Sequence, residues 1–242
     1  MYTCLAVLLM LTSLTPCLAA EPITSDENEE AARYNAPMAF SREHDGTILA
    51  MGMIQDNTAD AFRQFLDREH VRPGEILRLA SPGGHIGISL GRVITEHGLS
   101  TLLGDPYRPD HPVFCSSACT TAFIGGVDRL VVGTPIFLVH APEPELPDGS
   151  SYGPDQHMFS ITNLGSFARD FANDLRYARE RGVDPEFIAT SYATAHAGVQ
   201  QIDTDTLIKW RIVTSPALAP AVQQELMRVD PLRRELCGPA LP

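Results

Sequence analysis

The chain has 242 residues, of which 44% are hydrophobic and 20% charged. This is enough apolar material for the core of one domain of about 200 residues. The formal net charge of -12 at pH 7 makes the surface repel phosphate backbones and anionic membranes, so we expect no nucleic-acid partner.

The N-terminal segment predicts export. Residues 1–20 carry no charge and contain an apolar run at 5–11. That run is too short to cross a bilayer as a helix but is typical of a secretory signal peptide. Small residues precede the acidic stretch that begins at Glu21, which predicts cleavage after Ala19 or Ala20.

Two alternatives remain for this segment: a buried N-terminal helix, and a lipoprotein signal ending at Cys17, which Pro16 disfavours. We expect a periplasmic or secreted protein whose signal peptide is followed by a flexible acidic leader over 21–40. The main domain is then expected over 41–215, with a C-terminal extension over 216–242.

Strand and helix patterns alternate along the domain. Strands are predicted at 47–54, 75–80, 101–103, 130–132 and 136–139, and helices at 58–70, 85–97, 115–123, 162–181, 185–194 and 204–210. The stretch 141–160 is rich in Pro, Gly, Asp and Ser and is predicted to be a long exposed loop. Repeated β–α units predict an α/β fold with a parallel sheet and flanking helices.

Three segments follow predicted strands, where open α/β sheets place their sites. The first, 81–84, reads Ser-Pro-Gly-Gly between a strand and a helix. Glycines there let backbone N–H groups turn outward, as an oxyanion needs, although an ordinary turn has the same composition.

The second segment, 115–123, is a predicted small-residue helix with Ser117 near its start. The N–H of Ala118 would lie beside the Ser117 hydroxyl as an oxyanion donor. Ser116 and Ser117 are also natural N-caps, which is the structural alternative to catalysis.

The third segment ends in His140, directly after the apolar strand 136–139. A histidine at a strand end can act as a general base, or it can be merely structural. The other seven histidines show no ligand spacing, so no metal site is predicted.

Together the three segments resemble the proteolytic subunit of Clp proteases, of the Clp-protease/crotonase superfamily, and its exported relatives. The serine helix leads to Gly126, the strand 130–132, and then Ile-Phe-Leu-Val-His-Ala-Pro at 136–142. This resemblance covers about 47–214 and implies a ClpP/crotonase-like fold. The paired cysteines around Ser117 and the stretch 181–186 are more similar to the periplasmic branch of the family.

The resemblance implies a role for each matching residue. Ser117 would be the nucleophile, His140 the general base, and Gly83 and Ala118 the oxyanion donors. The implied activity is that of a serine hydrolase, expected to be a peptidase, which needs no cofactor.

The third member of the triad departs from the family pattern. The family places an acid at about 192–201, where this chain has no carboxylate. Asp203 is the candidate third acid, with Asp184 and Glu186 as alternatives. A Ser–Lys dyad is nearly excluded, because the only lysine, Lys209, falls in a predicted surface helix.

Three cysteines remain in the expected mature chain: Cys115, Cys119 and Cys237. Residues four apart on a helix have Cα atoms about 6 Å apart, within disulfide range. A Cys115–Cys119 bridge in an oxidising compartment and two buried thiols are both compatible with this spacing.

The expected partners follow from export and from the family. We expect peptide or protein substrates that are small or already unfolded, no ATP-dependent unfoldase, and self-assembly into a homo-oligomer of the kind this fold commonly forms. The alternative to an enzyme is a binding or scaffold protein that kept the fold and lost catalysis. Crotonase-type thioester chemistry is a third hypothesis, without a cofactor-binding feature to support it.

Overall fold

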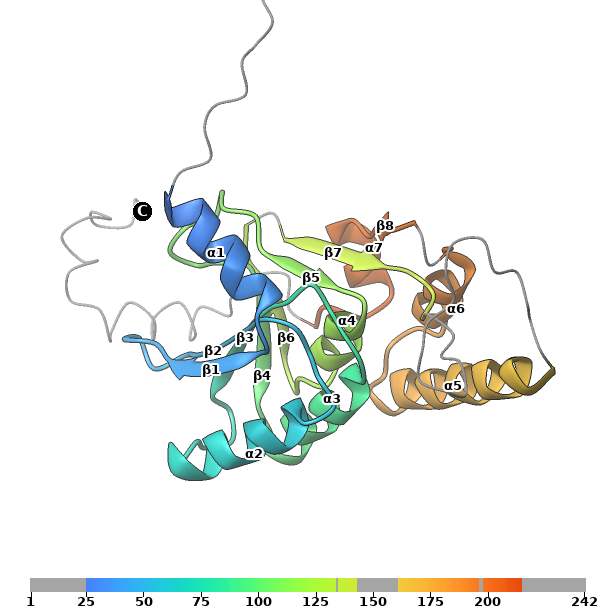
Figure 1. Cartoon of the computed structure of the whole chain (residues 1–242), viewed down its shortest axis with the longest axis horizontal. Helices are drawn as coiled ribbons and strands as arrows, with labels where there is room; N and C mark the ends of the chain where they lie inside the picture. The colour runs from blue at the N-terminus through green and yellow to red at the C-terminus, as the bar shows by residue number, and fades with distance from the viewer. Residues whose placement is uncertain (1–24, 134, 143–160, 196–197, 215–242) are drawn as a thin grey trace, which may run out of the picture.

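The computed structural model describes residues 25–133, 135–142, 161–195 and 198–214 (Figure 1). Its helices are Ser25–Asn35 (α1), Thr58–Arg68 (α2), Gly87–Glu96 (α3), Ala118–Phe123 (α4), Ile161–Glu180 (α5), Glu186–Ala193 (α6) and Thr204–Lys209 (α7). Its strands are Ala39–Arg42 (β1), Ile48–Met51 (β2), Ile76–Ala80 (β3), Ser100–Leu103 (β4), Phe114–Ser116 (β5), Arg129–Val131 (β6), Ile136–Val139 (β7) and Gln200–Gln201 (β8).

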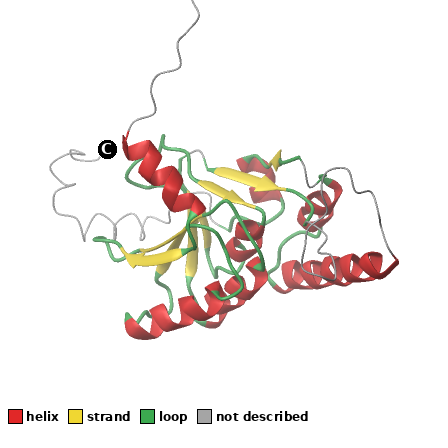
Figure 2. Cartoon of the chain, viewed as in Figure 1, coloured by secondary structure: helices red, strands yellow, loops and turns green. Residues whose placement is uncertain are grey.

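The main sheet has the order β1-β2-β3-β4-β6. Its strands are parallel except for the edge strand β1, which runs antiparallel to β2. All residues of β2, β4 and β6 are buried, as expected for parallel strands covered on both faces. Helices α2 and α3 lie together on one side of this sheet, and α1 lies on the other (Figures 1 and 2).

A smaller sheet has the order β5-β7-β8, with β5 parallel to β7 and β8 antiparallel to it. A single bridge between Ser81 and Cys115 connects the chain leaving β3 to β5. The first of the three candidate segments therefore runs directly beside the second.

Two arginines join the end of α4 to other parts of the chain. Arg181, after α5, donates to the carbonyl oxygens of Ile124 and Gly126, each at 3.2 Å. The buried Arg129 also donates to the Gly126 carbonyl, at 3.1 Å, and to the carbonyls of Arg211 and Ile212, each at 2.8 Å. Burial lowers the pKa of Arg129 to about 10, so it stays charged at neutral pH. The last carbonyl groups of a helix have no N–H partner within it, and positive charge near them stabilises the helix end.

The α/β class is confirmed, and most of the predicted elements occur at the predicted places in the chain. The predicted strand 136–139 matches β7 residue for residue, and β2, β3, β4 and β6 agree with prediction to within a few residues at their ends. The helices predicted at 58–70, 162–181, 185–194 and 204–210 correspond to α2, α5, α6 and α7.

Two predictions are corrected. Residues 115–123 are not one helix, because 114–116 form β5 and the helix begins only at Ala118. Within the stretch 21–40 expected to be a flexible leader, Ser25–Asn35 form α1, and Glu30 of this helix lies 2.9 Å from Nε2 of His111. Strands β1 and β8 were not predicted from the sequence. The predicted signal peptide, most of the loop 141–160 and the C-terminal extension lie outside the described residues.

Candidate active site

Ser117 occupies the turn that joins β5 to α4, called here the Ser117 turn (residues 115–119). Its φ is 53° and its ψ is -123°. A residue with a side chain pays about 1–3 kcal/mol for such backbone angles unless its surroundings impose them. In α/β hydrolases a strained strand-to-helix turn of this kind exposes the nucleophilic serine hydroxyl. The half-buried Ser117 thus has a backbone suited to a nucleophile.

His140 lies next to this turn, because β7, the strand that precedes it, neighbours β5. Ser116 is paired with Leu138 in the parallel register, and the Ser117 N–H donates to the Leu138 carbonyl at 3.0 Å. Continuing that register by one residue places Val139 opposite Ser117, and His140 is the next residue along the chain. The topology therefore brings the predicted nucleophile and base together.

The ring of the half-buried His140 contacts the backbone that follows it. Its Nδ1 lies 2.7 Å from the Ala141 carbonyl oxygen. A carbonyl only accepts, so in the neutral ring this contact holds the proton on Nδ1 and leaves Nε2 unprotonated. The Ala141 N–H donates to the Thr194 carbonyl at 2.9 Å, which fixes the segment after β7 to the end of α6.

The Gly83–Gly84 peptide packs against the Ser117 turn. A Cβ on Gly83 would lie 2.7 Å from both the Ser116 carbonyl oxygen and the Ser117 Cβ, and the φ of Gly83 is +106°. Gly83 thus permits an approach that a side chain would block. This close packing brings the predicted oxyanion segment into contact with the predicted nucleophile.

The hydrogen bonds around residues 81–85 show that the N–H groups of Gly83 and Gly84 have different surroundings. The Gly83 N–H donates to the buried Ser81 Oγ at 3.1 Å. The Gly83 carbonyl and the His85 N–H both bond to Ile54, on the β2 side. In a parallel ladder the intervening residue, Gly84, directs its N–H to the opposite side. That side is the one on which Ser81 bridges to Cys115, so the Gly84 N–H is directed toward the Ser117 turn.

Ala118 is the first residue of α4, so its N–H has no partner within the helix. A hypothetical Cβ on Gly83 would lie 3.4 Å from this nitrogen. The predicted donor Ala118 therefore lies at the same contact as Gly83. Sequence reasoning did not single out Gly84, whose N–H the ladder geometry directs toward the same turn.

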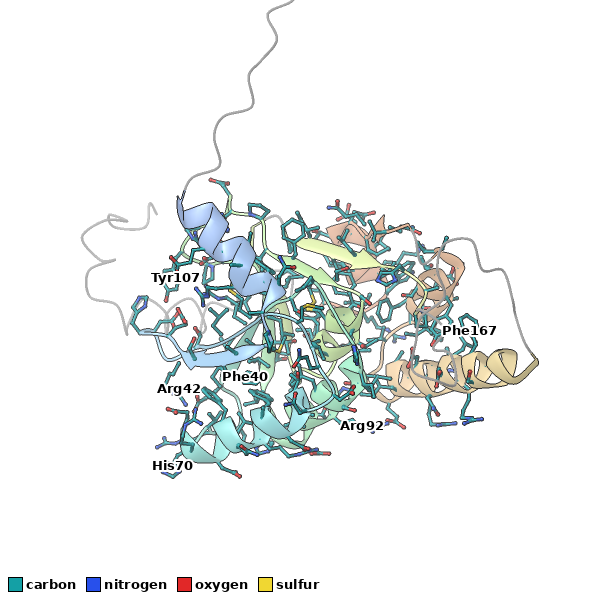
Figure 3. The ribbon with its side chains drawn as sticks, viewed as in Figure 1. Phe40, Arg42, His70, Arg92, Tyr107 and Phe167 are labelled. Carbon is teal, nitrogen blue, oxygen red and sulfur yellow. A yellow bond between two sulfur atoms is a disulfide. The ribbon has the colours of Figure 1, made fainter. Side chains whose placement is uncertain are left out.

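Cys115 and Cys119 form a disulfide across the Ser117 turn (drawn as a yellow bond in Figure 3), with their Cα atoms 5.2 Å apart. Both side chains are fully buried. The two residues are close because the chain reverses at Ser117 between a strand and a helix, and not because they share a helix.

The three candidate acids lie at helix starts, and two of them, Asp203 and Asp184, accept hydrogen bonds there. Asp203 caps α7, where its carboxylate accepts from the Thr206 N–H at 2.8 Å and from the Thr206 hydroxyl at 3.1 Å. The first of these bonds lowers the pKa of Asp203. Asp184 accepts from the Glu186 N–H at 3.0 Å, and Glu186 is exposed in the first turn of α6.

Sequence reasoning missed Asp174, a carboxylate on α5 that contacts α6. Asp174 accepts a hydrogen bond from the Tyr192 hydroxyl at 2.8 Å, and the Tyr192 ring packs edge-on against Phe167 and Phe171. Burial, and to a smaller extent the neighbouring Asp170, raises the pKa of Asp174 to about 6. Tyr192 lies two residues before Thr194, so this pair stabilises the end of α6 that holds Ala141.

A cleft of about 440 Å³ lies away from these residues, between α1 and the sheet. Its lining includes Tyr34, Arg78 and Tyr107, the last of which is labelled beside α1 in Figure 3, but neither Ser117 nor His140. Arg78 is already paired with Asp105 at 3.0 Å.

Comparison with known proteins adds no family to this description: no family model matches the chain, and a search of curated proteins finds no significant similarity. Within the described ranges, no three His, Cys, Asp or Glu side chains are grouped so that they could hold a metal ion. No helix in the same part of the chain has the length and apolar character needed to cross a membrane.

Proposed function

We propose that this chain is an exported serine hydrolase, and more narrowly a peptidase with a Clp-protease-like fold. The observation that carries the proposal is the backbone of Ser117, whose strained angles occur where β5, β7 and the Gly83–Gly84 peptide meet. Such strain costs free energy and is typical of functional sites.

In the proposed reaction the Ser117 hydroxyl attacks the carbonyl carbon of the substrate, and Nε2 of His140 accepts the hydroxyl proton. The negative charge that develops on the substrate oxygen is stabilised by the N–H groups of Gly84 and Ala118. We assign Gly84 to this role instead of Gly83, because the Gly83 N–H is already donated to Ser81. His140 then protonates the leaving group, and water releases the acyl group from Ser117 by the reverse sequence.

The Ala141 carbonyl takes the orienting position that an acid has in the usual triad. It selects the correct tautomer of His140 through the contact at Nδ1. A neutral carbonyl stabilises the charged imidazolium less than a carboxylate does, so the expected enzyme is slower than one with a complete Ser-His-Asp triad.

The expected substrates are peptides or unfolded proteins, because an exported enzyme has no ATP to drive an unfoldase. Location outside the cytoplasm agrees with the Cys115–Cys119 disulfide, since disulfides persist in oxidising compartments. Self-association and the apolar N-terminal segment as a signal peptide remain parts of this proposal.

The direct test is intact-mass analysis of the purified oxidised protein after treatment with a fluorophosphonate. We expect one adduct on the parent chain, none on Ser117→Ala, and normal labelling of the matched control Ser116→Ala. His140→Gln is expected to slow labelling at least 100-fold. A folded parent that gains no adduct would refute the hydrolase.

The second candidate function is a binding or scaffold protein that lost catalysis. The cap that Asp203 forms on α7 favours it, because that carboxylate is already used. This candidate predicts no fluorophosphonate adduct and retention of peptide binding by Ser117→Ala.

A further inference from the structure

We propose that the Cys115–Cys119 disulfide is a positioning clamp for the candidate nucleophile: it keeps Ser117 and the Ala118 N–H in the reactive arrangement. This inference rests on the proposed function for its catalytic consequence, but its structural part can be tested separately. It starts from the position of the bond, which closes a five-residue ring with Ser117 at its centre.

The backbone of Ser117 needs such a constraint. Among the described non-glycine residues, positive φ occurs at His70, Ser117 and Arg211. His70 and Arg211 follow the C-terminal ends of α2 and α7, where a left-handed residue commonly ends a helix. Ser117 instead precedes a helix, so no such helix-ending motif accounts for its angles.

Backbone hydrogen bonds exclude one way for the turn to relax. The N–H groups of Ser116 and Ser117 donate to the carbonyls of Ser81 and Leu138, each at 3.0 Å. These bonds hold residues 115–117 against two neighbouring chain segments. A helix that began before Ser117 would break these bonds, so the chain stays extended up to residue 117.

The disulfide excludes the opposite relaxation. If β5 extended forward through Ser117, the Cα atoms of residues 115 and 119 would move to about 13 Å apart. A disulfide tolerates Cα separations of only about 4.4–6.8 Å, and the observed value is 5.2 Å. Because the hydrogen bonds hold residues 115–117 extended and the disulfide keeps Cys119 beside Cys115, the chain has to reverse at Ser117, where the strained angles occur.

The position of the cysteines also matches the steric demand of the turn. In serine nucleophile turns the residues two before and two after the serine approach each other and are often glycine. Here those positions are Cys115 and Cys119, and the close approach is a covalent bond between two fully buried side chains. Burial means that a reducing thiolate reaches the bond only after local opening, so the clamp is expected to be permanent in the folded protein.

The test compares the oxidised full-length mature protein, the double variant Cys115→Ala/Cys119→Ala, and the control Leu66→Ala. Leu66 is buried on α2, away from the turn, so its truncation lowers overall stability without touching Ser117. Two quantities are measured on each folded protein: the second-order rate of fluorophosphonate labelling, and hydrogen exchange of peptides that cover 114–121.

For the double variant we expect labelling at least tenfold slower and exchange at 114–121 at least tenfold faster, since the turn spends most of its time relaxed. For Leu66→Ala we expect a labelling rate within twofold of the parent. Parental labelling and parental exchange in the double variant would overturn the clamp. An unreactive parent whose 114–121 exchange still accelerates in the double variant would refute the hydrolase and leave the clamp standing.

A second measurement, on the parent protein, tests the clamp even if the double variant fails to fold. Dithiothreitol in sub-denaturing urea reduces the bond: its two thiols supply two electrons and two protons, two protein thiols form, and the reagent closes to its cyclic disulfide. Labelling should fall in step with the number of alkylatable cysteines and return on reoxidation with glutathione disulfide. Labelling that stays constant while both thiols become alkylatable would overturn the clamp.

Discussion

The two sides of the candidate site are held by different kinds of interaction. On the serine side, the Ser117 turn is fixed by backbone hydrogen bonds to two strands, by close packing of Gly83 and by a buried disulfide. On the histidine side, the bonds described for the segment after β7 include one from the Ala141 N–H to the Thr194 carbonyl, at the end of α6. That helix is in turn tied to α5 by the Asp174–Tyr192 hydrogen bond and aromatic packing.

The two sides therefore differ in whether the groups that hold them titrate. A nucleophile in a strained backbone needs restraints that do not titrate, and hydrogen-bonded backbone and a covalent bond supply them. The histidine side depends instead on a half-buried carboxyl whose pKa burial raises to about 6. We therefore expect the serine side to be insensitive to pH near neutrality and the histidine side to respond to it.

The largest effect is expected from Gly84→Ala. The new Cβ would lie 2.0 Å from the Ile54 carbonyl oxygen, and the φ of Gly84 is +133°. We expect a loss of at least about 3 kcal/mol in the free energy of unfolding. Fluorophosphonate labelling of the remaining folded protein should fall about 100-fold, because an oxyanion donor is displaced. Urea unfolding and labelling rates measure the two effects.

Gly74→Ala is the matched control for that substitution. Gly74 also has a positive φ, of +87°, but no atom lies within 4 Å of its hypothetical Cβ. Its replacement should cost about 1–2 kcal/mol from backbone strain alone and leave labelling unchanged. Parental labelling by folded Gly84→Ala would remove Gly84 from the oxyanion site.

A smaller effect is expected from Asp174→Asn, as a change in how stability depends on pH. The native carboxyl keeps its proton up to a pKa of about 6, whereas the unfolded one loses it near 3.8. Between these values the native state binds more protons, so the free energy of unfolding falls as pH rises from about 4 to about 6. The free energy of unfolding falls by about 3 kcal/mol over this range, and Asp174→Asn should abolish that fall.

Urea unfolding of parent and variant at several pH values between 4 and 7 measures this difference. Asp170→Asn, an exposed change one turn away on α5, is the control and should keep most of the parental slope. Parallel pH profiles for the parent and Asp174→Asn would contradict the assignment of a raised pKa to Asp174.

The smallest effect is expected from Asp203→Ser. A serine hydroxyl can accept from the Thr206 N–H as the carboxylate does, so α7 keeps its cap. We expect little change in thermal unfolding and a labelling rate within twofold of the parent. A fall of 100-fold or more in the labelling rate would show instead that Asp203 acts on His140 as the acid of a complete triad.

Local patterns were sufficient for most of the scaffold. The apolar runs in β2 and β7 predicted buried strands, and the amphipathic pattern of α2 predicted a helix with one buried face. Cys115 and Ser116 were misassigned to a helix because small residues of this kind favour neither state. Pairing with Ile136–Val139 and Ser81, which are distant in sequence, makes them a strand. The leader was misassigned because its contacts, such as Glu30 with His111, are equally distant.

The sequence by itself determined the α/β class, the places of most elements, and the choice of Ser117 and His140 as candidates after a helix start and a strand end. Only the tertiary structure decided which glycine N–H is directed to the serine, which group orients the histidine, and what backbone Ser117 adopts. The physical reason is that hydrophobic periodicity is a local property. The direction of an N–H and the strain of a turn are instead set by hydrogen bonds to strands far away in the chain.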